Sequence, residues 1–227
     1  MDLYRLTSKL NIVRLYRIGK RKRSYDTSLR RERAAEAQAR VLDVARQLFA
    51  ARGYAETTLE AIATESEVAL PTLYANFGSK RGLLTRLLGH LIRNDPGAAS
   101  ILETAGARAV FAEADPRRAL AIFAEHMAEI QARIATTYEV MKGAARTEPD
   151  LAESFASAQQ TRLAMLTKVA AHVAGGLRAG LTVEEAGRTI WVLASPETRQ
   201  MLVTHGGYTA DAYRVWLADT LAAALLA

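Results

Sequence analysis

Polar side chains with the chemistry to bind nucleic acid lie close together at Thr72, Tyr74, Asn76 and Lys80. The hydroxyl of Tyr74 can reach a phosphate, and the side chains of Thr72 and Asn76 can hydrogen-bond to base edges. A lysine at the start of a helix, such as Lys80, offers its charge and the N-terminal amides of that helix to one phosphate. These groups can act together if one short helix exposes the first three and a second helix begins near Lys80.

Groups that could catalyse a reaction or hold a metal ion are scattered instead. The four histidines, at positions 90, 126, 172 and 205, lack the spacing of a zinc site, and the chain has no cysteine. Glu125 and Glu129 share a helix face, but His126 points about 100° away from Glu125. We find no glycine loop for phosphates and no nucleophile elbow in the sequence. We therefore expect no catalytic residues, no metal site and no cofactor, and we do not expect an enzyme.

The composition is that of a packed protein. The 227 residues are 50% hydrophobic and 24% charged, with a net charge of +6. The absence of cysteine excludes a disulfide-stapled scaffold and fits the reducing cytoplasm, which is the expected location. No apolar stretch approaches the roughly 20 residues that a bilayer-spanning helix needs, so we expect no membrane partner.

Charge is distributed unevenly along the chain. Residues 1–93 carry 18 Lys and Arg against 9 Asp and Glu, whereas the remainder carries 12 basic against 15 acidic residues. A basic first part favours a polyanionic partner, with nucleic acid ahead of an acidic membrane surface. A membrane-surface adaptor remains the second class of function, although the basic N-terminus lacks the aromatic-rich apolar face that it would need. A comparison of binding to duplex DNA with binding to anionic vesicles at matched salt distinguishes these two classes of function.

Apolar residues recur at helical spacing and strand alternation is nearly absent, which predicts an all-α fold. In the first part, we expect a helix with an apolar stripe over 41–49 that ends at Gly53, and a second helix with a capping box of Thr57 and Glu60. A third helix is expected from Pro71 to Phe77, and a fourth that Ser79 caps and Asp95-Pro96-Gly97 closes. Beyond it, helices are expected over 98–114, 116–146 and 150–176, then from a capping box of Thr182 and Glu185 to His205 with a kink at Ser195-Pro196, and finally from the cap Thr209.

The second and third helices are too short to fold singly. From Thr58 to Phe77, with a turn near 66–69, they have the length and spacing of a helix-turn-helix, whose second helix enters the major groove of DNA. On that helix Val68, Leu73 and Phe77 are expected to face inward. Leu70, Pro71, Thr72, Tyr74 and Asn76 are expected to face outward.

Segments of this region form a specific pattern: RVLDVARQLF at 40–49, RGY at 52–54, TTLEAIA at 57–63 and TLYANFGSK at 72–80. They resemble the DNA-binding domain of TetR-family transcriptional regulators. A weaker resemblance over 191–202 and 213–217 is to the C-terminal helices of one branch of that family. The family often has Ser where Ala69 stands, and Lys-Gly where Leu70-Pro71 stand, which leaves the operator sequence open.

The resemblance implies a ligand-responsive regulator, with repressor as the usual role. Such a protein binds a palindromic operator in duplex DNA as a homodimer and is released by a small-molecule effector. At matching positions Thr58, Thr72, Tyr74 and Lys80 contact DNA in the family; the outward face adds Leu70 and Asn76 to the expected DNA-binding set.

The expected organisation is a basic extension over 1–33, a DNA-binding domain over 34–93 and a regulatory and dimerisation domain over 94–227. We interpret 1–19 as a solvated tail and 20–33 as an arm along a DNA groove. Dimerisation is expected through 150–177 and 183–203, and the alternative is that these helices pack within one chain. Effector-binding candidates, each of which core packing would also explain, are Phe123, His126, Met127, Tyr138, Met141 and Arg162. A body that only dimerises, without a ligand, is the competing reading.

Overall fold

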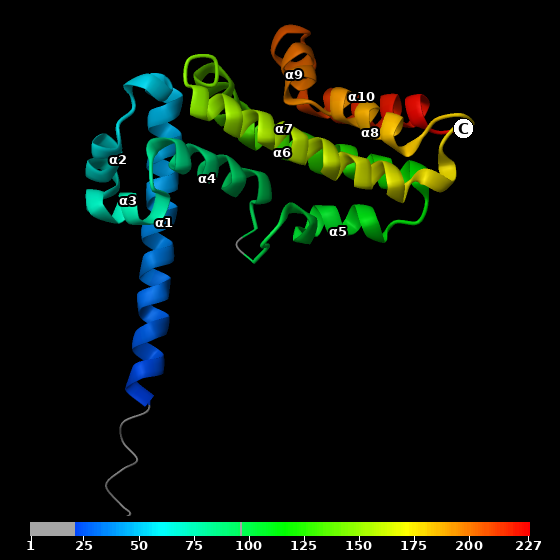
Figure 1. Cartoon of the computed structure of the whole chain (residues 1–227). Helices are drawn as coiled ribbons and strands as arrows, with labels where there is room; N and C mark the ends of the chain where they lie inside the picture. Colours follow the sequence, from blue (N-terminus) through cyan, green and yellow to red (C-terminus); the bar gives the residue numbers. More distant parts are fainter. Residues whose placement is uncertain (1–20, 96) are drawn as a thin grey trace, which may run out of the picture.

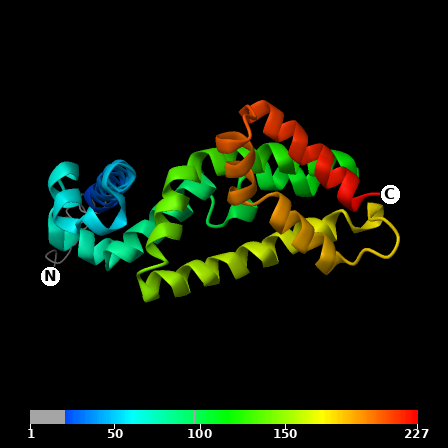
Figure 2. The same ribbon diagram turned by 90° about the horizontal axis from the view of Figure 1, so that it is seen from above.

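The computed structural model describes residues 21–95 and 97–227, with side chains from residue 28 onward. These residues are almost entirely helical, which confirms the predicted all-α class. A head of α1–α4 stands beside a longer body of α5–α10, and the C-terminus lies at the end of the body far from the head (Figures 1 and 2). The head consists of α1 (Arg21–Glu56), α2 (Leu59–Ser66), α3 (Leu70–Phe77) and α4 (Lys80–Arg93). The body consists of α5 (Ala105–Ala112), α6 (Pro116–Ala144), α7 (Pro149–His172), α8 (Val183–Leu193), α9 (Pro196–Arg199) and α10 (Ala210–Leu225). Short 3₁₀ helices, η1 (Ile101–Glu103) and η2 (Ala174–Gly176), and a π-helix, η3 (Gln200–His205), lie between them.

Helix α1 extends far beyond its predicted apolar stripe. Its end is as expected, because Gly53 breaks the helical path with φ 73° and ψ −177°. Its beginning differs from the prediction, because the helix already starts at Arg21. The described part of the expected basic extension is therefore continuous with the head. Residues 1–20, including the predicted tail and Lys20, lie outside the described residues.

Most helix starts follow their predicted caps. Ser79, Asp115 and Thr209 each accept a bond from a backbone amide in the first turn of the following helix, and Thr182 with Glu185 forms the predicted capping box. The predicted capping box of Thr57 and Glu60 is wrong. Helix α2 is capped by Thr58, whose side chain accepts from the amide of Ala61.

Two predicted helices of the body are also wrong in part. The stretch 98–114 contains the turn η1 and the short α5 rather than one long helix. The predicted kink at Ser195-Pro196 is a helix end, because α8 stops at Leu193 and Ser195 caps the separate α9. Pro116 and Pro149 begin α6 and α7 in their first turns, where the missing amide hydrogen costs nothing. Pro96, expected to close α4, lies outside the described residues; α4 ends at Arg93, and Asn94 adopts a left-handed C-cap.

Helix α6 belongs to two hydrophobic cores at once. Its first half, with Ala119, Leu120 and Phe123, packs with α7, α8 and α10 in the core of the body. Its second half, with Ile130 and Ile134, packs with α1–α4 in the core of the head. The head core therefore does not end at the predicted domain boundary after Arg93. Any movement of α6 is transmitted to both cores.

Candidate nucleic-acid interface

Helix α3 is held by one buried face, which leaves the opposite face to solvent. Leu73 is 0% exposed and Phe77 is 8% exposed, both within the head core. On the other side Pro71, Thr72 and Asn76 are exposed, as predicted, and Tyr74 is an exposed aromatic residue at 48%. Leu70 differs from the prediction, because it is half-buried against the head core.

The turn before α3 is tight and depends on the backbone. Glu67 adopts the left-handed conformation with φ 55°, and its amide donates to carbonyls at the end of α2. Ala69 stands at the N-cap of α3 without a side-chain bond, whereas Pro71 in the first turn sets a helical φ in advance. The alanine at position 69, where the family often has serine, therefore removes the side-chain cap of α3 without changing where the helix begins.

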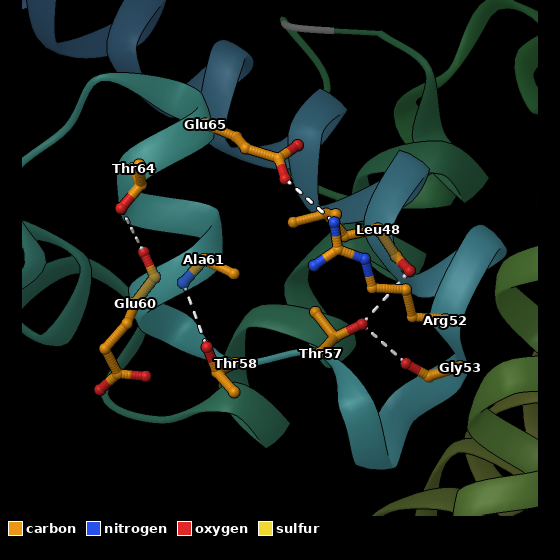
Figure 3. Close-up of polar contacts among 9 residues, drawn as sticks. All are labelled: Leu48, Arg52, Gly53, Thr57, Thr58, Glu60, Ala61, Thr64 and Glu65. Atoms are coloured by element: carbon orange, nitrogen blue, oxygen red, sulfur yellow. Dashed lines mark hydrogen bonds and ion pairs between the residues drawn. The ribbon is translucent and has the colours of Figure 1, made fainter.

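Two adjacent threonines have different tasks at the junction of α1 and α2 (Figure 3). Thr58 is exposed and caps α2, with 3.1 Å between its Oγ1 and the amide nitrogen of Ala61. Thr57 is fully buried. Its Oγ1 donates to the carbonyl oxygen of Gly53 at 2.7 Å, and the carbonyl oxygen of Leu48 lies 3.2 Å from the same atom. Thr57 thus ties the end of α1 to the start of the helix-turn-helix. Sequence reasoning assigned it a cap and missed this contact.

Lys80 bridges the head internally. Its Nζ donates to the carbonyls of Tyr54 at 2.8 Å and Ala55 at 3.3 Å, and it lies 4.3 Å from the centre of the Tyr54 ring. A cation favours the C-terminal end of a helix, which here is the end of α1. Burial, followed by the charge of Glu148, raises the pKa of Tyr54. The ammonium group therefore fixes α4 to α1.

The junction of α3 and α4 leaves no room for a side chain at Gly82. A Cβ there would fall closer than 3.0 Å to the carbonyl oxygen of Phe77, the last residue of α3. Ser79 caps α4 by accepting from the amide of Gly82 at 3.1 Å. From the next turn, Arg86 donates to the carbonyl of Asn76 at 3.5 Å and lies over the ring of Phe77. The start of α4 therefore sets the position of the exposed face of α3.

The comparisons with known proteins agree with this geometry. Residues 41–87 match the sequence model of the bacterial regulatory proteins of the tetR family. Residues 41–87 therefore carry a TetR-family DNA-binding domain. The recognition of that family from the sequence motifs is confirmed. An uncharacterized HTH-type transcriptional regulator of Bacillus subtilis, YvkB, is 39% identical over 64 residues, which are 28% of this chain. That match spans 32% of the length of the relative.

Solved structures show that the likeness of fold extends over most of the chain. A structure from Saccharomonospora viridis in complex with choline has a TM-score of 0.62 at 19% identity and covers 85% of this chain and 99% of that one. NalD of Pseudomonas aeruginosa, described as the secondary repressor of the MexAB-OprM multidrug efflux pump, has a TM-score of 0.61 at 18% identity, covering 85% and 98%. The fatty acid degradation regulator FadR of Bacillus halodurans has 0.59 at 16%, covering 81% and 93%. At these identities the likeness shows a shared fold.

The effector-binding candidates of the body do not form one group. Phe123 lies in the core of the body, Tyr138 and Met141 lie in the core of the head, and Met127 packs against both. His126 lies beside Gly106 of α5, with its Nε2 at 3.5 Å from Oγ1 of Thr104, and burial lowers its pKa. The sequence suggested no such division, because five of the six positions fall on one predicted helix, 116–146, and helical spacing does not show which core each one faces.

Arg162 is satisfied within the chain. Its guanidinium donates to the carbonyls of Trp191 at 3.0 Å and Ala194 at 2.6 Å, and burial lowers its pKa. Gln131 also donates to the Ala194 carbonyl and accepts from the hydroxyl of Tyr213 at 2.8 Å. Burial raises the pKa of Tyr213 to about 12. These bonds tie α6, α7 and α10 to the end of α8.

A small cavity of about 190 Å³ opens beside this network. Its wall includes Gln131, Ala135 and Tyr138 of α6, and Arg199 and Thr204 of the α9–η3 segment, which lies opposite. Tyr138 donates to Glu197 at 2.9 Å and accepts from Gln159 at 2.8 Å. Burial and the charge of Glu197 raise the pKa of Tyr138.

Glu197 completes the polar side of this region. Lys142 lies 3.3 Å from its carboxylate. Burial alone would raise the pKa of Glu197, but hydrogen bonds from its own amide, from Tyr138 and from Lys142 outweigh burial and lower it. Of the predicted effector-binding residues, Tyr138 lines the cavity. Gln131 and Arg199 were not predicted, because nothing in their local sequence marks them.

Within residues 21–95 and 97–227 no cluster of three or more histidine, aspartate or glutamate side chains is placed to hold a metal ion. Among the helices that the structure describes, none is long and apolar enough to cross a membrane.

Proposed function

We propose that the chain is a transcriptional regulator that binds a palindromic operator in duplex DNA as a homodimer. The observation that carries the proposal is the division of α3 into a buried face and an exposed face of Pro71, Thr72, Tyr74 and Asn76. A helix held in this way can enter the major groove with its polar face toward the bases. Repression is the role we propose, in line with the repressor named among the structures of similar fold. We propose no catalytic step and no cofactor.

Two substitutions separate base reading from phosphate contact. Thr72→Ala is expected to change the preferred bases, because a lost base contact is worth about 1–3 kcal/mol at one position. Lys80→Ala is expected to weaken binding to all sequences and to reduce the salt slope by about one unit, because the positive charge that would face a phosphate is lost. Gel-shift titrations against operator and scrambled duplexes at several salt concentrations measure both effects. If neither variant differs from the wild type, α3 is not the recognition helix.

The dimer is proposed on the face of the body that exposes large apolar side chains. Val192 of α8, Met201 of η3 and Val215 of α10 are 54%, 66% and 51% exposed. Such groups are costly to leave in water and are typical of an interface. The sequence placed the dimer on 150–177 and 183–203, which correspond to α7 and to α8, α9 and most of η3. The exposed residues keep α8 and η3 in the proposal and replace α7 by α10, because α7 exposes mainly small and polar side chains.

The effector is proposed to act through α6. The 190 Å³ cavity lies against Ala135 and Tyr138 of α6, while Ile134 on the same helix lies in the head core. Arg133 of α6 also donates to the carbonyl of Leu91 of α4 at 3.2 Å. A small molecule that displaces α6 would therefore move α4 and, through the Gly82 junction, α3.

Filling the cavity tests this route. Ala135→Phe is expected to leave operator binding intact and to abolish the release that effectors cause, because the larger side chain occupies their space. A library of small metabolites is screened for release of a labelled operator from the wild-type protein, and each active compound is then tested on the variant. Equal release from both proteins would place the effector elsewhere, and a library without any active compound would favour a body that only dimerises.

A further inference from the structure

The first part of α1 is a rod that the cores of the protein do not cover. In Figure 1 it continues past α2 and α3, and in Figure 2 it is seen end-on, so it projects away from the long axis of the body. No side chain from residue 28 to residue 40 is buried, whereas Val41 is 1% exposed. The packed part of α1 thus begins at Val41, and the preceding helix extends into solvent.

Positive and negative side chains lie on opposite sides of this exposed helix. At about 100° per residue, Arg30, Arg31, Arg33 and Arg40 fall within about half of the circumference. Glu32 and Glu36 fall on the opposite half. Seven basic and three acidic residues occupy positions 21–40 of the sequence, so the whole segment carries an excess of positive charge.

The basic side has a defined direction relative to the head. Arg30 and Arg31 stand 18 residues, or five full turns, before Leu48 and Phe49. Leu48 and Phe49 are buried in the head core, so that face of α1 is the one directed toward α2–α4. Over about 27 Å of helix, the two arginines therefore lie on the same side of α1 as the helix-turn-helix, in the space beyond it.

We propose that residues 28–40 of α1 form a basic helical arm that contacts the phosphates of duplex DNA next to the segment read by α3. The proposal rests on the proposed function, because the arm adds contacts to the same bound duplex. An isolated helix of this length gains little from propensity alone, and a polyanion along its basic side would stabilise it. The arm would add affinity and salt dependence without adding base recognition.

Duplex DNA fits this arm better than a lipid surface does. A helix that lies on a membrane needs an apolar face to insert between headgroups. The exposed segment from 28 to 40 has Leu29 as its one large apolar residue; the others are charged, polar or alanine. The arm is also continuous with the head that carries α3.

The test replaces the charges of the arm in the full chain. The variant Arg30→Gln, Arg31→Gln, Arg33→Gln is compared with a control, Arg117→Gln, Arg118→Gln, Arg178→Gln, which removes the same charge from exposed positions at the other end of the body. The probe is the duplex that the wild-type protein selects from a random library. For each protein the dissociation constant is measured from 50 to 300 mM salt, with circular dichroism as the check on folding.

The arm variant is expected to lower the salt slope by about three units per subunit, at about 0.9 per phosphate contact, with the selected sequence unchanged and a shorter footprint. The control is expected to keep the wild-type slope and footprint. Equal slopes for the two variants would overturn the arm. Loss of binding to phosphatidylserine vesicles in the arm variant, with an unchanged slope on DNA, would overturn it in favour of a membrane. A wild-type protein that selects no duplex would instead contradict the proposed function itself.

Discussion

Gly82→Ala is expected to abolish operator binding and to destabilise the head. The new Cβ would fall closer than 3.0 Å to the carbonyl oxygen of Phe77, which is backbone and cannot rotate away. Relief requires α3 and α4 to separate, and overpacking of this kind costs about 1–3 kcal/mol. Because the exposed face of α3 must match a groove, we expect the loss of affinity to exceed what the loss of stability explains. Gel shifts on the operator and thermal unfolding by circular dichroism measure the two effects.

Gly89→Ala in the same helix is the matched control. A Cβ there would meet its nearest neighbour, the Arg93 guanidinium, at 3.4 Å, which is ordinary contact with a flexible side chain. Because alanine is favoured over glycine within a helix by up to about 1 kcal/mol, this variant should unfold at the same or a higher temperature and bind normally. Wild-type affinity in Gly82→Ala would show that the junction of α3 and α4 does not position the recognition helix.

The double variant Met201→Glu, Val215→Glu is expected to be a monomer. Two carboxylates would replace apolar side chains that are exposed in one chain and would be buried between two, where unpaired charge is costly. Light scattering should give twice the 24.7 kDa of one chain for the wild type and a single chain for the variant. Operator affinity should fall by at least about 100-fold, because the second half-site is no longer tethered to the first.

Ala171→Glu distinguishes this face from the one that the sequence predicted. Ala171 is exposed on α7, within the segment 150–177 through which the sequence predicted dimerisation. The Ala171→Glu variant should leave the mass and the affinity unchanged. A monomeric Ala171→Glu beside a dimeric double variant would return the interface to α7.

Local signals predicted much of the head. Pro71, Gly78 and Ser79 mark helix boundaries through their own backbone preferences, and each lies where it was expected. The two adjacent threonines show the limit of such signals. Whether Thr57 or Thr58 caps α2 depends on where Gly53 turns the end of α1, since that turn buries the first threonine and exposes the second.

Contacts between distant residues account for the rest. The carbonyls that bind Lys80 belong to Tyr54 and Ala55 at the end of another helix. The position of Lys80 at a helix start predicted a phosphate contact and gave no sign of this bridge. The partners of Arg162 are carbonyls at the end of α8. These carbonyls can accept from a side chain because the helix stops before Pro196. The arm of α1 lacks an apolar stripe, and hydrophobic periodicity therefore gave no signal of its helix.

Selection from a random duplex library with the full-length chain tests the central claim most directly. We predict that the wild-type protein enriches a palindrome whose half-sites are about one helical turn, or a multiple of it, apart. Thr72→Ala should enrich a palindrome of the same spacing with altered bases. Recovery of no common sequence by the wild type, or of the same bases by wild type and variant, would contradict the account of α3 as the helix that reads the operator.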